Sequence, residues 1–427
     1  MRKKKIIVVG TDAFNEYELS QIENYNRYEF VSLFHPKEIQ NKEVIDVENI
    51  IQTINKTIRS QKDGVDGIIT FFDFPFTLVT FYIAKLHNLN APSLLSVLKC
   101  EHKYWSRIEQ SKIVPANVPR FDKIDPFEGK GLDELIVKPP FWIKPIKTHS
   151  SQLGFKVETN NDFKQAISKM KKRIHHFAKP FNFIFYKENL PEEIRKIDGF
   201  HCLTEELLKG HQCTLSGYVY NHEVYTYGIV DSLFYDQAPS FLCYMLPSRL
   251  PGSVKERMQV IAKDVMKQIG FNHAPFNIEF FYNEEKNEIK ILEINPRMSQ
   301  SHGYIYSMVK GHSNHQVLVK LAIGEKPNFI QNKGKYPVAA KFQYRIFHDG
   351  KIEQLPPEYK IKELENVFSD SNIQINVKEG DILSALKIND AYSYCIAEIM
   401  LAAESKEALF EKYNEIKKSL NIKIEKR

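Results

Sequence analysis

The sequence predicts a mixed fold of α/β and α+β units, with an N-terminal parallel α/β domain ahead of larger, strand-rich regions. Two observations carry this prediction. Strand and helix signals alternate from Lys4 to about Pro92, the pattern of a parallel sheet covered on both faces. Strand signals then dominate much of the remaining chain, and a total of 427 residues suffices for two or three domains. We place the units at residues 1–95, 96–330 and 331–427.

The N-terminal unit begins with a short apolar run, Ile6 to Val9, which stops at Gly10. This run is too short for the apolar segment of a signal peptide and fits a first buried strand. Gly10-Thr11-Asp12 and Asp73-Phe74-Pro75 follow predicted strands, at the sheet edge where ligands bind, and turn chemistry explains them equally well. The later elements are strands at residues 29–33 and 67–72 and helices at residues 47–58 and 76–86.

Several classes of protein lose their support in this sequence. It holds neither G-x-G-x-x-G after the first strand nor G-x-x-x-x-G-K-[ST], so Rossmann and P-loop signatures are missing. No window reaches the roughly 18 uninterrupted apolar residues of a membrane span. The basic runs behind the net charge of +6 are usually solvated, so we expect neither a nucleic-acid nor a membrane partner. Five cysteines scattered singly predict reduced thiols and a cytoplasmic location.

The middle and C-terminal units carry clear element signals. An amphipathic helix is predicted at residues 256–269, closed by Gly270. Asn160 or Asn161 is expected to cap a helix that runs to Lys172. The other predicted elements are helices at residues 99–109 and 405–420 and strands at residues 118–121, 141–145, 276–282, 288–294, 338–347 and 373–377.

The strongest chemical signal is a predicted hairpin that carries carboxylates. Glu279 and Glu293 lie on its two strands and can point to one face, and Asn295 returns to that face two residues later. Two carboxylates and an amide oxygen suit Mg²⁺, with Mn²⁺ as the alternative. Arg297 could neutralise a transferring phosphoryl group with its planar guanidinium. The plain alternative is a solvated hairpin face, which an unpaired carboxylate within an apolar run disfavours.

A second group of residues suggests phosphate binding. Lys144 ends a predicted strand and precedes a loop of small and hydroxyl-bearing residues, Lys147 to Gly154. A lysine beside such a loop can hold phosphates as a point charge with added donors. Lys103 is a second candidate, although each lysine taken alone is more often a surface residue.

In their order along the chain these residues resemble the ATP-grasp enzymes. The order is Lys103, then Lys144-Pro145, then Thr204 to Gly210, then Glu279, then Glu293-Ile294-Asn295-Pro296-Arg297. The resemblance covers nearly the whole chain. It implies that the first unit is the α/β domain preceding the clamp, that the middle unit is a two-lobed nucleotide clamp, and that the last unit is similar to the C-terminal domain of the biotin carboxylase branch.

The resemblance also implies roles for individual residues. Lys103 and Lys144 would bind ATP phosphates, with Ser150 and Ser151 as donors of the phosphate loop. The backbone of Glu205, Glu206, Leu207 and Leu208 would meet the adenine. Glu279, Glu293 and Asn295 would hold Mg²⁺, and Arg297 would face the γ-phosphate and the acyl phosphate. Gln212 stands where many relatives place a ribose-binding glutamate, which leaves a ribose contact there in doubt.

The activity implied by the resemblance is ATP-dependent ligation of a small carboxylate to an amine through an acyl phosphate, releasing ADP and phosphate. Amino acids or peptide-like molecules are the expected substrates, and a homodimer is left open. One alternative is biotin-carboxylase-type carboxylation, but Ser301 stands at the place of the glutamate base and serine cannot serve as that base. The other alternative is a catalytically idle nucleotide-binding protein.

Four residues are candidates for the substrate side of the site. Arg249 lies in a rigid proline-flanked loop and could hold a carboxylate, or it could belong to an ordinary turn before a helix. Ser299, Ser301 and His302 directly follow the metal motif and could line the acceptor side. A lone histidine such as His302 is more often structural.

Overall fold

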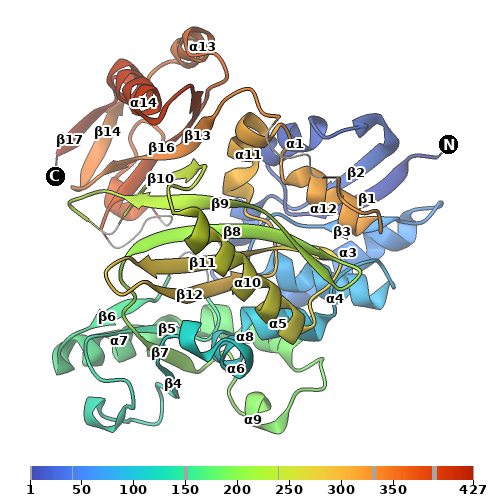
Figure 1. Ribbon diagram of the computed structural model, residues 1–427, viewed down its shortest axis with the longest axis vertical. Helices are drawn as coiled ribbons and strands as arrows, with labels where there is room; N and C mark the ends of the chain where they lie inside the picture. Colours follow the sequence, from blue (N-terminus) through green and yellow to red (C-terminus); the bar gives the residue numbers. More distant parts are fainter. Residues whose placement is uncertain are drawn as a thin grey trace.

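The computed structural model describes residues 2–40, 42–148, 152–238, 240–328, 333–386 and 392–426 (Figure 1). Its N-terminal part is the expected parallel sheet, with β1 (Lys4–Val9) between β2 (Tyr28–Leu33) and β3 (Gly67–Ile69). The side chains of Ile6 to Val9 are fully buried because helices cover both faces of the sheet. β3 was expected to run to residue 72 but ends at Ile69. The chain therefore leaves the sheet earlier and carries Asp73 beyond the sheet edge.

The helices of the N-terminal part are α1 (Ala13–Ser20), α2 (Pro36–Gln40), α3 (Val47–Ser60) and α4 (Phe76–Leu86). Two of them, α3 and α4, were predicted from the sequence, and α1 and α2 were not. Asp12 and Asp46 cap α1 and α3 by accepting hydrogen bonds from backbone N–H groups three residues on. The apolar residues of α3 recur at helical spacing and are buried, as the sequence pattern predicts.

The predicted helix at residues 99–109 is wrong as a single element. Two helices occupy this region, α5 (Leu94–Glu101) and α6 (Lys103–Ile113), and His102 separates them. The His102 Nδ1 atom accepts a hydrogen bond from the backbone N–H of Trp105 at 3.1 Å and so caps α6. The break places Lys103 in the first turn of α6, where its backbone N–H donates to the Ile146 carbonyl instead of continuing α5.

The small lobe is a four-stranded antiparallel sheet in the order β4-β7-β5-β6. Its strands are β4 (Phe121–Ile124), β5 (Phe141–Pro145), β6 (Phe155–Val157) and β7 (Cys202–Glu206). Its helices are α7 (Asn160–Arg173), α8 (His175–Phe185) and α9 (Glu192–Arg195). Two expectations are corrected here. Thr159 caps α7 in place of Asn160 or Asn161, and residues 115–117 form a 3₁₀ turn, so the strand expected at residues 118–121 begins only at Phe121.

The large sheet has eight strands in the order β12-β11-β8-β9-β10-β13-β16-β15. It crosses the boundary placed at residue 330, because β13 pairs with β10, so the C-terminal unit extends the sheet of the middle unit. The strands are β8 (His211–Tyr220), β9 (Glu223–Phe234), β10 (Phe241–Leu246), β11 (Ala274–Asn283), β12 (Glu288–Asn295), β13 (Val338–Ile346), β15 (Asn372–Ile375) and β16 (Tyr394–Ala403).

Helices cover this sheet from both sides (Figure 1). α10 (Gly252–Ile269) packs on β8 and β9 and ends at Gly270, whose φ of 74° is left-handed, as the sequence predicts. α14 (Lys406–Leu420) packs on β13 and β16. The remaining elements are α11 (Gly303–Lys310), α12 (His315–Ala322), α13 (Glu358–Val367) and the pair β14 (Gly350–Gln354) and β17 (Lys423–Lys426).

Two findings bear on the exclusions made from the sequence. Within the described ranges, no helix has both the length and the apolar character needed to cross a membrane. All five cysteines lie in these ranges and are free thiols.

Candidate functional site

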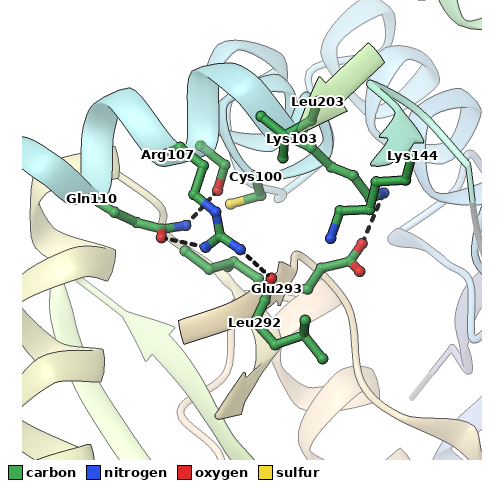
Figure 2. A pocket seen from close by; sticks show the side chains of 10 residues that line it. Cys100, Lys103, Arg107, Gln110, Lys144, Leu203, Leu292 and Glu293 are labelled. Atoms are coloured by element: carbon green, nitrogen blue, oxygen red, sulfur yellow. Dashed lines mark hydrogen bonds and ion pairs between the residues drawn. The ribbon is translucent and has the colours of Figure 1, made fainter. Parts of the chain in front are cut away.

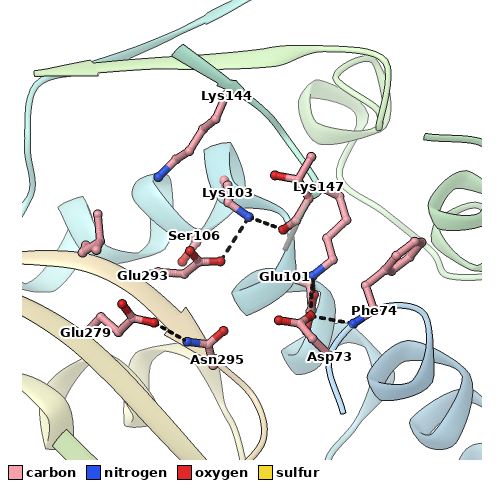
Figure 3. Close-up of polar contacts among 12 residues, drawn as sticks. Asp73, Phe74, Glu101, Lys103, Ser106, Lys144, Lys147, Glu279, Glu293 and Asn295 are labelled. Carbon is pink, nitrogen blue, oxygen red and sulfur yellow. Dashed lines mark hydrogen bonds and ion pairs between the residues drawn. The ribbon is translucent and has the colours of Figure 1, made fainter. Parts of the chain in front are cut away.

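A pair of carboxylates lies on β11 and β12, the two strands at one end of the large sheet. Glu279 of β11 stands directly opposite Glu293 of β12, and Asn277 stands opposite Asn295. The Asn295 Nδ2 atom donates to Asn277 Oδ1 at 3.0 Å. It also donates to Glu279 Oε1 at 3.3 Å (Figure 3). Gln212 of β8 donates from Nε2 to Glu279 Oε2 at 3.1 Å. The strand register therefore brings all these polar groups to one face of the sheet.

The two carboxylates have different electrostatic surroundings. Burial and the nearby charge of Glu293 raise the pKa of Glu279 to about 7. Burial also acts to raise the pKa of Glu293, but Lys103 and Lys144 outweigh it and hold that pKa below its ordinary value. Glu279 is thus the carboxylate whose charge is least compensated by the protein itself.

This donor set fits a hard divalent cation. The two carboxylates and the Asn295 amide supply oxygen ligands, and the raised pKa of Glu279 reports a negative charge without a matching positive one. The described part of the chain has no group of three or more His, Cys, Asp or Glu residues able to hold a metal ion. A Mg²⁺ ion here would therefore take its other ligands from phosphates and water, as Mg²⁺ commonly does.

Two lysines face this hairpin from the small lobe and α6. Lys103 Nζ forms an ion pair with Glu293 Oε1 at 3.0 Å and donates to the Thr148 carbonyl, also at 3.0 Å (Figure 3). Burial lowers the pKa of Lys103 despite its pairing with Glu293. Lys144 of β5 pairs with Glu205 of β7. Both lysine side chains are buried, and the positive charge of each is compensated by a carboxylate of the protein, Glu293 for Lys103 and Glu205 for Lys144.

A small pocket lies between α6 and the hairpin (Figure 2). The residues that line it are Cys100, Lys103, Ser106, Arg107, Gln110, Lys144, Leu203, Leu292, Glu293 and Ile294. Two lysines and an arginine point into a space that the hairpin carboxylate Glu293 also borders. This combination suits a phosphate-bearing ligand that shares a cation with Glu293.

Arg107 is a buried residue of this pocket that sequence reasoning missed. Its Nε and Nη2 atoms donate to Glu205 Oε2 at 3.1 and 2.9 Å, and it also donates to the carbonyls of Ile291 and Leu292 at 3.0 and 2.7 Å. Burial would raise the pKa of Glu205, but Lys144 and Arg107 lower it to about 2. Arg107 thus ties the small-lobe strand β7 to the backbone of β12. The only sequence signal was its position four residues after Lys103 on one helix face.

The other residues expected to contact the nucleotide fall around β7 and β8. Glu206 ends β7 and accepts a hydrogen bond from the Nε atom of Arg120 at 3.1 Å, and Leu207 and Leu208 follow directly. Gln212 is engaged with the carboxylate of Glu279. Ser150 and Ser151 lie outside the described residues.

Arg297 connects the hairpin to the N-terminal domain. Its Nη2 atom lies 2.6 Å from Asp73 Oδ2 and 3.4 Å from Asn295 Oδ1, and its Nη1 atom donates to the Met298 carbonyl. Burial acts to lower the pKa of Arg297, but Asp73 outweighs it and raises that pKa. Asp73 also pairs with Lys147 at 3.2 Å. The sequence marked Asp73 only as a sheet-edge residue, and nothing local indicated its partner.

Among the candidates for the substrate side, three lie together after the hairpin. His302 is 2% exposed, and its ring centroid lies 5.3 Å from that of Tyr244 on β10. Burial, with the charges of Lys341 and Arg297, lowers the pKa of His302 to about 3. Ser301 precedes it in a 3₁₀ turn, and the Ser299 carbonyl accepts a hydrogen bond from Asn314 at 2.8 Å.

The structure places Arg249 away from these residues. Its Nη2 atom contacts His211 Nδ1 at 3.1 Å, and its backbone N–H donates to Asp231 Oδ2 at 2.9 Å. His211 and Gln212 alternate along β8, so their side chains point to opposite faces of the sheet. Because Gln212 contacts Glu279, Arg249 belongs to the face away from the carboxylate pair.

Comparison with known proteins agrees with this geometry. The ATP-grasp domain family matches residues 137–303. No curated protein sequence matches the chain. Among solved structures, the L-amino acid ligase from Bacillus licheniformis is similar with a TM-score of 0.73 and 15% identity, covering 99% of both chains. The biotin carboxylase from Campylobacter jejuni is similar with a TM-score of 0.66 and 15% identity, covering 99% of this chain and 92% of that one.

A third similar structure is the N5-carboxyaminoimidazole ribonucleotide synthetase from Thermotoga maritima, with a TM-score of 0.63, 14% identity and coverage of 99% and 100%. At these identities the likeness establishes the fold over the whole chain. The matching ATP-grasp domain contains β5, β7 and the complete carboxylate hairpin. Residues 137–303 therefore match the ATP-grasp domain family, and the chain as a whole has the fold of the L-amino acid ligase and biotin carboxylase structures.

Proposed function

We propose that this protein is an ATP-dependent ligase that activates a small-molecule carboxylate as an acyl phosphate and joins it to an amine, releasing ADP and phosphate. The observation that carries the proposal is the convergence on one site of a carboxylate pair, two buried lysines and the half-buried Arg297. Such a site can bind polyphosphate and neutralise the charge of a transferring phosphoryl group.

The lysines act in this proposal by exchanging partners. Lys103 pairs with Glu293 and Lys144 pairs with Glu205, and the phosphates of ATP would take over these two cations. Glu293 then becomes available to a divalent ion, and Glu205 keeps Arg107 as its partner. Mg²⁺, when bound by Glu279, Glu293 and Asn295, supplies positive charge to the phosphate oxygens.

Arg297 would stabilise the phosphoryl group during transfer to the substrate carboxylate. Its planar guanidinium matches the oxygens of phosphate and carboxylate groups, and it lies next to the metal ligand Asn295. The amine nucleophile then attacks the carbonyl carbon of the acyl phosphate, forming the C–N bond and expelling phosphate, while the amine loses its proton.

We place the amine substrate between the hairpin and the C-terminal strands. The charges of Glu279 and Arg297, and those of Glu398 and Arg345 on the C-terminal strands, all act on Tyr244 of β10. Lys341 of β13 pairs with Glu398 of β16 at 3.0 Å. A positive and a negative side chain side by side suit a substrate that bears both an ammonium and a carboxylate group. The substrate class of the similar L-amino acid ligase agrees with this choice, so we propose amino acids or short peptides.

The carboxylation alternative is less well supported by the residues near Arg297. A biotin-carboxylase-type reaction needs a base beside bicarbonate, and Ser301 stands in the position where the resemblance leads us to expect a glutamate. The neighbouring His302 has a pKa lowered to about 3, so it stays neutral at ordinary pH and is a weak base.

The decisive experiment supplies Mg²⁺-ATP with pairs drawn from a library of amino acids and small carboxylates. Phosphate release identifies active pairs, and mass spectrometry identifies the condensed product and the nucleotide product. The proposal expects ADP and an amide that depends on both substrates. AMP with pyrophosphate, or ATP turnover without a condensed product, would contradict it, and the Glu293→Gln variant serves as the inactive control.

A further inference from the structure

Four residues of alternating charge, of which Glu101 and Lys147 are buried and Asp73 and Arg297 are half-buried, form a chain that ends at the carboxylate hairpin. Glu101 at the end of α5 pairs with Lys147, Lys147 lies 3.2 Å from Asp73, and Asp73 lies 2.6 Å from Arg297 (Figure 3 shows the first three). These residues come from four separate segments, in α5, after β5, after β3 and after β12. The chain of ion pairs thus connects the N-terminal domain to the residue proposed to stabilise the phosphoryl group.

Burying these charges is costly, which makes a purely structural role a poor explanation. Lys147 is 2% exposed and Glu101 is 5% exposed. Burial acts to raise the pKa of Glu101 and to lower that of Lys147, so each depends on its partner to stay charged. Apolar residues of similar volume often stabilise a protein as well as a buried ion network does. A network retained at the edge of a reactive site is better explained by the orientation it gives to its last member.

Asp73 controls the orientation of Arg297 through one nitrogen. The Nη2 atom is held by Asp73, while Nη1 donates to the Met298 carbonyl. The Nε atom of Arg297 is buried and has no hydrogen-bond partner among the described residues. The two Nη atoms of the guanidinium are therefore held by the protein, while Nε remains an unused donor. This is the state expected of an arginine that is to bind an oxygen ligand.

We propose that Asp73 is a positioning residue, which fixes the guanidinium of Arg297 for the transferring phosphoryl group. Lys147 and Glu101 act behind it, because Lys147 holds the other carboxylate oxygen of Asp73 and Glu101 neutralises Lys147. The N-terminal domain thus contributes to the site through the loop after β3. This inference rests on the proposed function, since it assigns a purpose to Arg297.

The test is a double-mutant cycle between Asp73→Asn and Arg297→Lys, with Asp73→Glu as the conservative variant. Asp66→Asn is the matched control, because Asp66 is also an ion-paired aspartate of the N-terminal domain, paired with Arg2 and Lys4. The assay measures phosphate release from Mg²⁺-ATP with an equimolar mixture of the twenty L-amino acids. Melting temperatures are measured for every variant.

If Asp73 acts through Arg297, Asp73→Asn lowers kcat by about 10- to 100-fold and leaves the KM for ATP within about threefold, because small misplacements of a reacting group cost rate. In the Arg297→Lys background, where Asp73 has no guanidinium to orient, the same change costs less than about threefold. Asp73→Glu restores part of kcat. A kcat within twofold of the parent, or effects that multiply in the double variant, would overturn the inference, and multiplication would assign Asp73 to the substrate itself.

A binding measurement separates failure of this inference from failure of the proposed function. Calorimetry compares the affinity of each variant for AMPPNP with its affinity for ADP, both in the presence of Mg²⁺, so the measurement needs no turnover. Arg297→Lys should reduce the preference for the triphosphate analogue, and Asp73→Asn should reduce it in the same direction. An unchanged preference in Asp73→Asn beside a reduced one in Arg297→Lys contradicts the inference alone. If the parent binds both nucleotides but never forms a condensed product, the proposed function fails, and the calorimetric comparison still decides the role of Asp73.

Discussion

Glu279 and Glu293 stand opposite each other on neighbouring strands, and within the described part of the chain only Glu293 has a lysine at ion-pair distance, Lys103 at 3.0 Å. Because their surroundings differ, the two carboxylates have pKa values shifted in opposite directions. Glu293 is kept ionised by the lysines that ATP phosphates would also contact, whereas Glu279 has a pKa raised to about 7. A divalent cation between the two would relieve the excess negative charge on Glu279.

Glu293→Gln should abolish ligation without unfolding the protein. The change keeps the shape of the side chain but removes a negative charge from the proposed cation site and from Lys103. Arg297→Lys keeps its charge but loses the planar fork, and losing one such stabilising donor typically costs about 10² to 10³ in rate. Product formation and melting temperature are measured together, with Glu288→Gln, an exposed position on the same strand, as control. Near-parental turnover in a folded Glu293→Gln variant would contradict the proposed role of the hairpin in catalysis.

Glu279→Gln should make the metal-free protein more stable at alkaline pH. Because the folded-state pKa of Glu279 is raised from 4.5 to about 7, its contribution to stability is present below pH 4.5 and is lost as pH rises through 7. Glutamine does not titrate, so the variant should lose less stability between pH 5 and 8.5, by about 1–2 kcal/mol after allowing for partial solvent access. Denaturant unfolding in EDTA measures this difference. Mg²⁺ should stabilise the parent more than the variant, and equal pH profiles would contradict the assignment.

Much of the carboxylate hairpin could be predicted because it depends on local rules. Strand alternation places Glu293 and Asn295 on one face, and a short turn makes Glu279 their neighbour. The pairs Arg107–Glu205 and Asp73–Arg297 could not be predicted, because their members are 98 and 224 residues apart and meet only through tertiary packing. The break between α5 and α6 at His102 was not predicted, for another reason. Both flanking segments favour helix and hold neither Pro nor Gly, and the cap depends on a histidine side chain.

Arg107→Met should destabilise the protein strongly, because it leaves the carboxylate of Glu205 buried with Lys144 as its remaining ionic partner. Removing one member of a buried ion pair typically costs about 3–5 kcal/mol. Adding Glu205→Gln to this variant should recover part of the loss, since the unpaired charge is gone. Arg120→Met is a matched control, because Arg120 pairs with the adjacent Glu206 but is 86% exposed, and exposed pairs contribute about 0–1 kcal/mol. Equal losses from the two arginine variants would contradict this account.

Glu398→Gln should weaken binding of the amine substrate while nucleotide binding stays intact. Glu398 pairs with Lys341 on the C-terminal strands, among the charged neighbours of Tyr244, and among the described residues it forms no ion pair with Lys103 or Lys144, the lysines proposed to bind phosphate. Losing a charge-assisted hydrogen bond to an ammonium group typically costs about 1.5–3 kcal/mol, so the KM for the amino acid should rise by about 10- to 100-fold. Steady-state kinetics with each substrate varied in turn measure this split. The exposed Glu404→Gln is the control, and a parallel rise in the KM for ATP would contradict the placement.

His102 should make the protein sensitive to mild acid. The neutral ring accepts a hydrogen bond at Nδ1 from Trp105 and donates from Nε2 to the Ile197 carbonyl, and burial lowers its pKa from 6.5 to about 4. Because the folded-state pKa is lowered, the unfolded chain binds more protons below pH 6.5, and stability falls as pH decreases toward 4. At pH 5 this amounts to about 2 kcal/mol relative to neutral pH.

His102→Asn tests this sensitivity, because asparagine can also cap a helix and does not titrate in this range. The variant should be less stable than the parent at pH 7.5, where it lacks the Nε2 hydrogen bond to Ile197, and the gap between them should narrow at pH 5. Thermal unfolding at both pH values measures the gap, with the exposed His348→Asn as control. His302 and His315 are also buried with lowered pKa values, so some acid sensitivity should persist in the variant. A gap that stays constant with pH would show that the ring of His102 is not a source of the acid sensitivity.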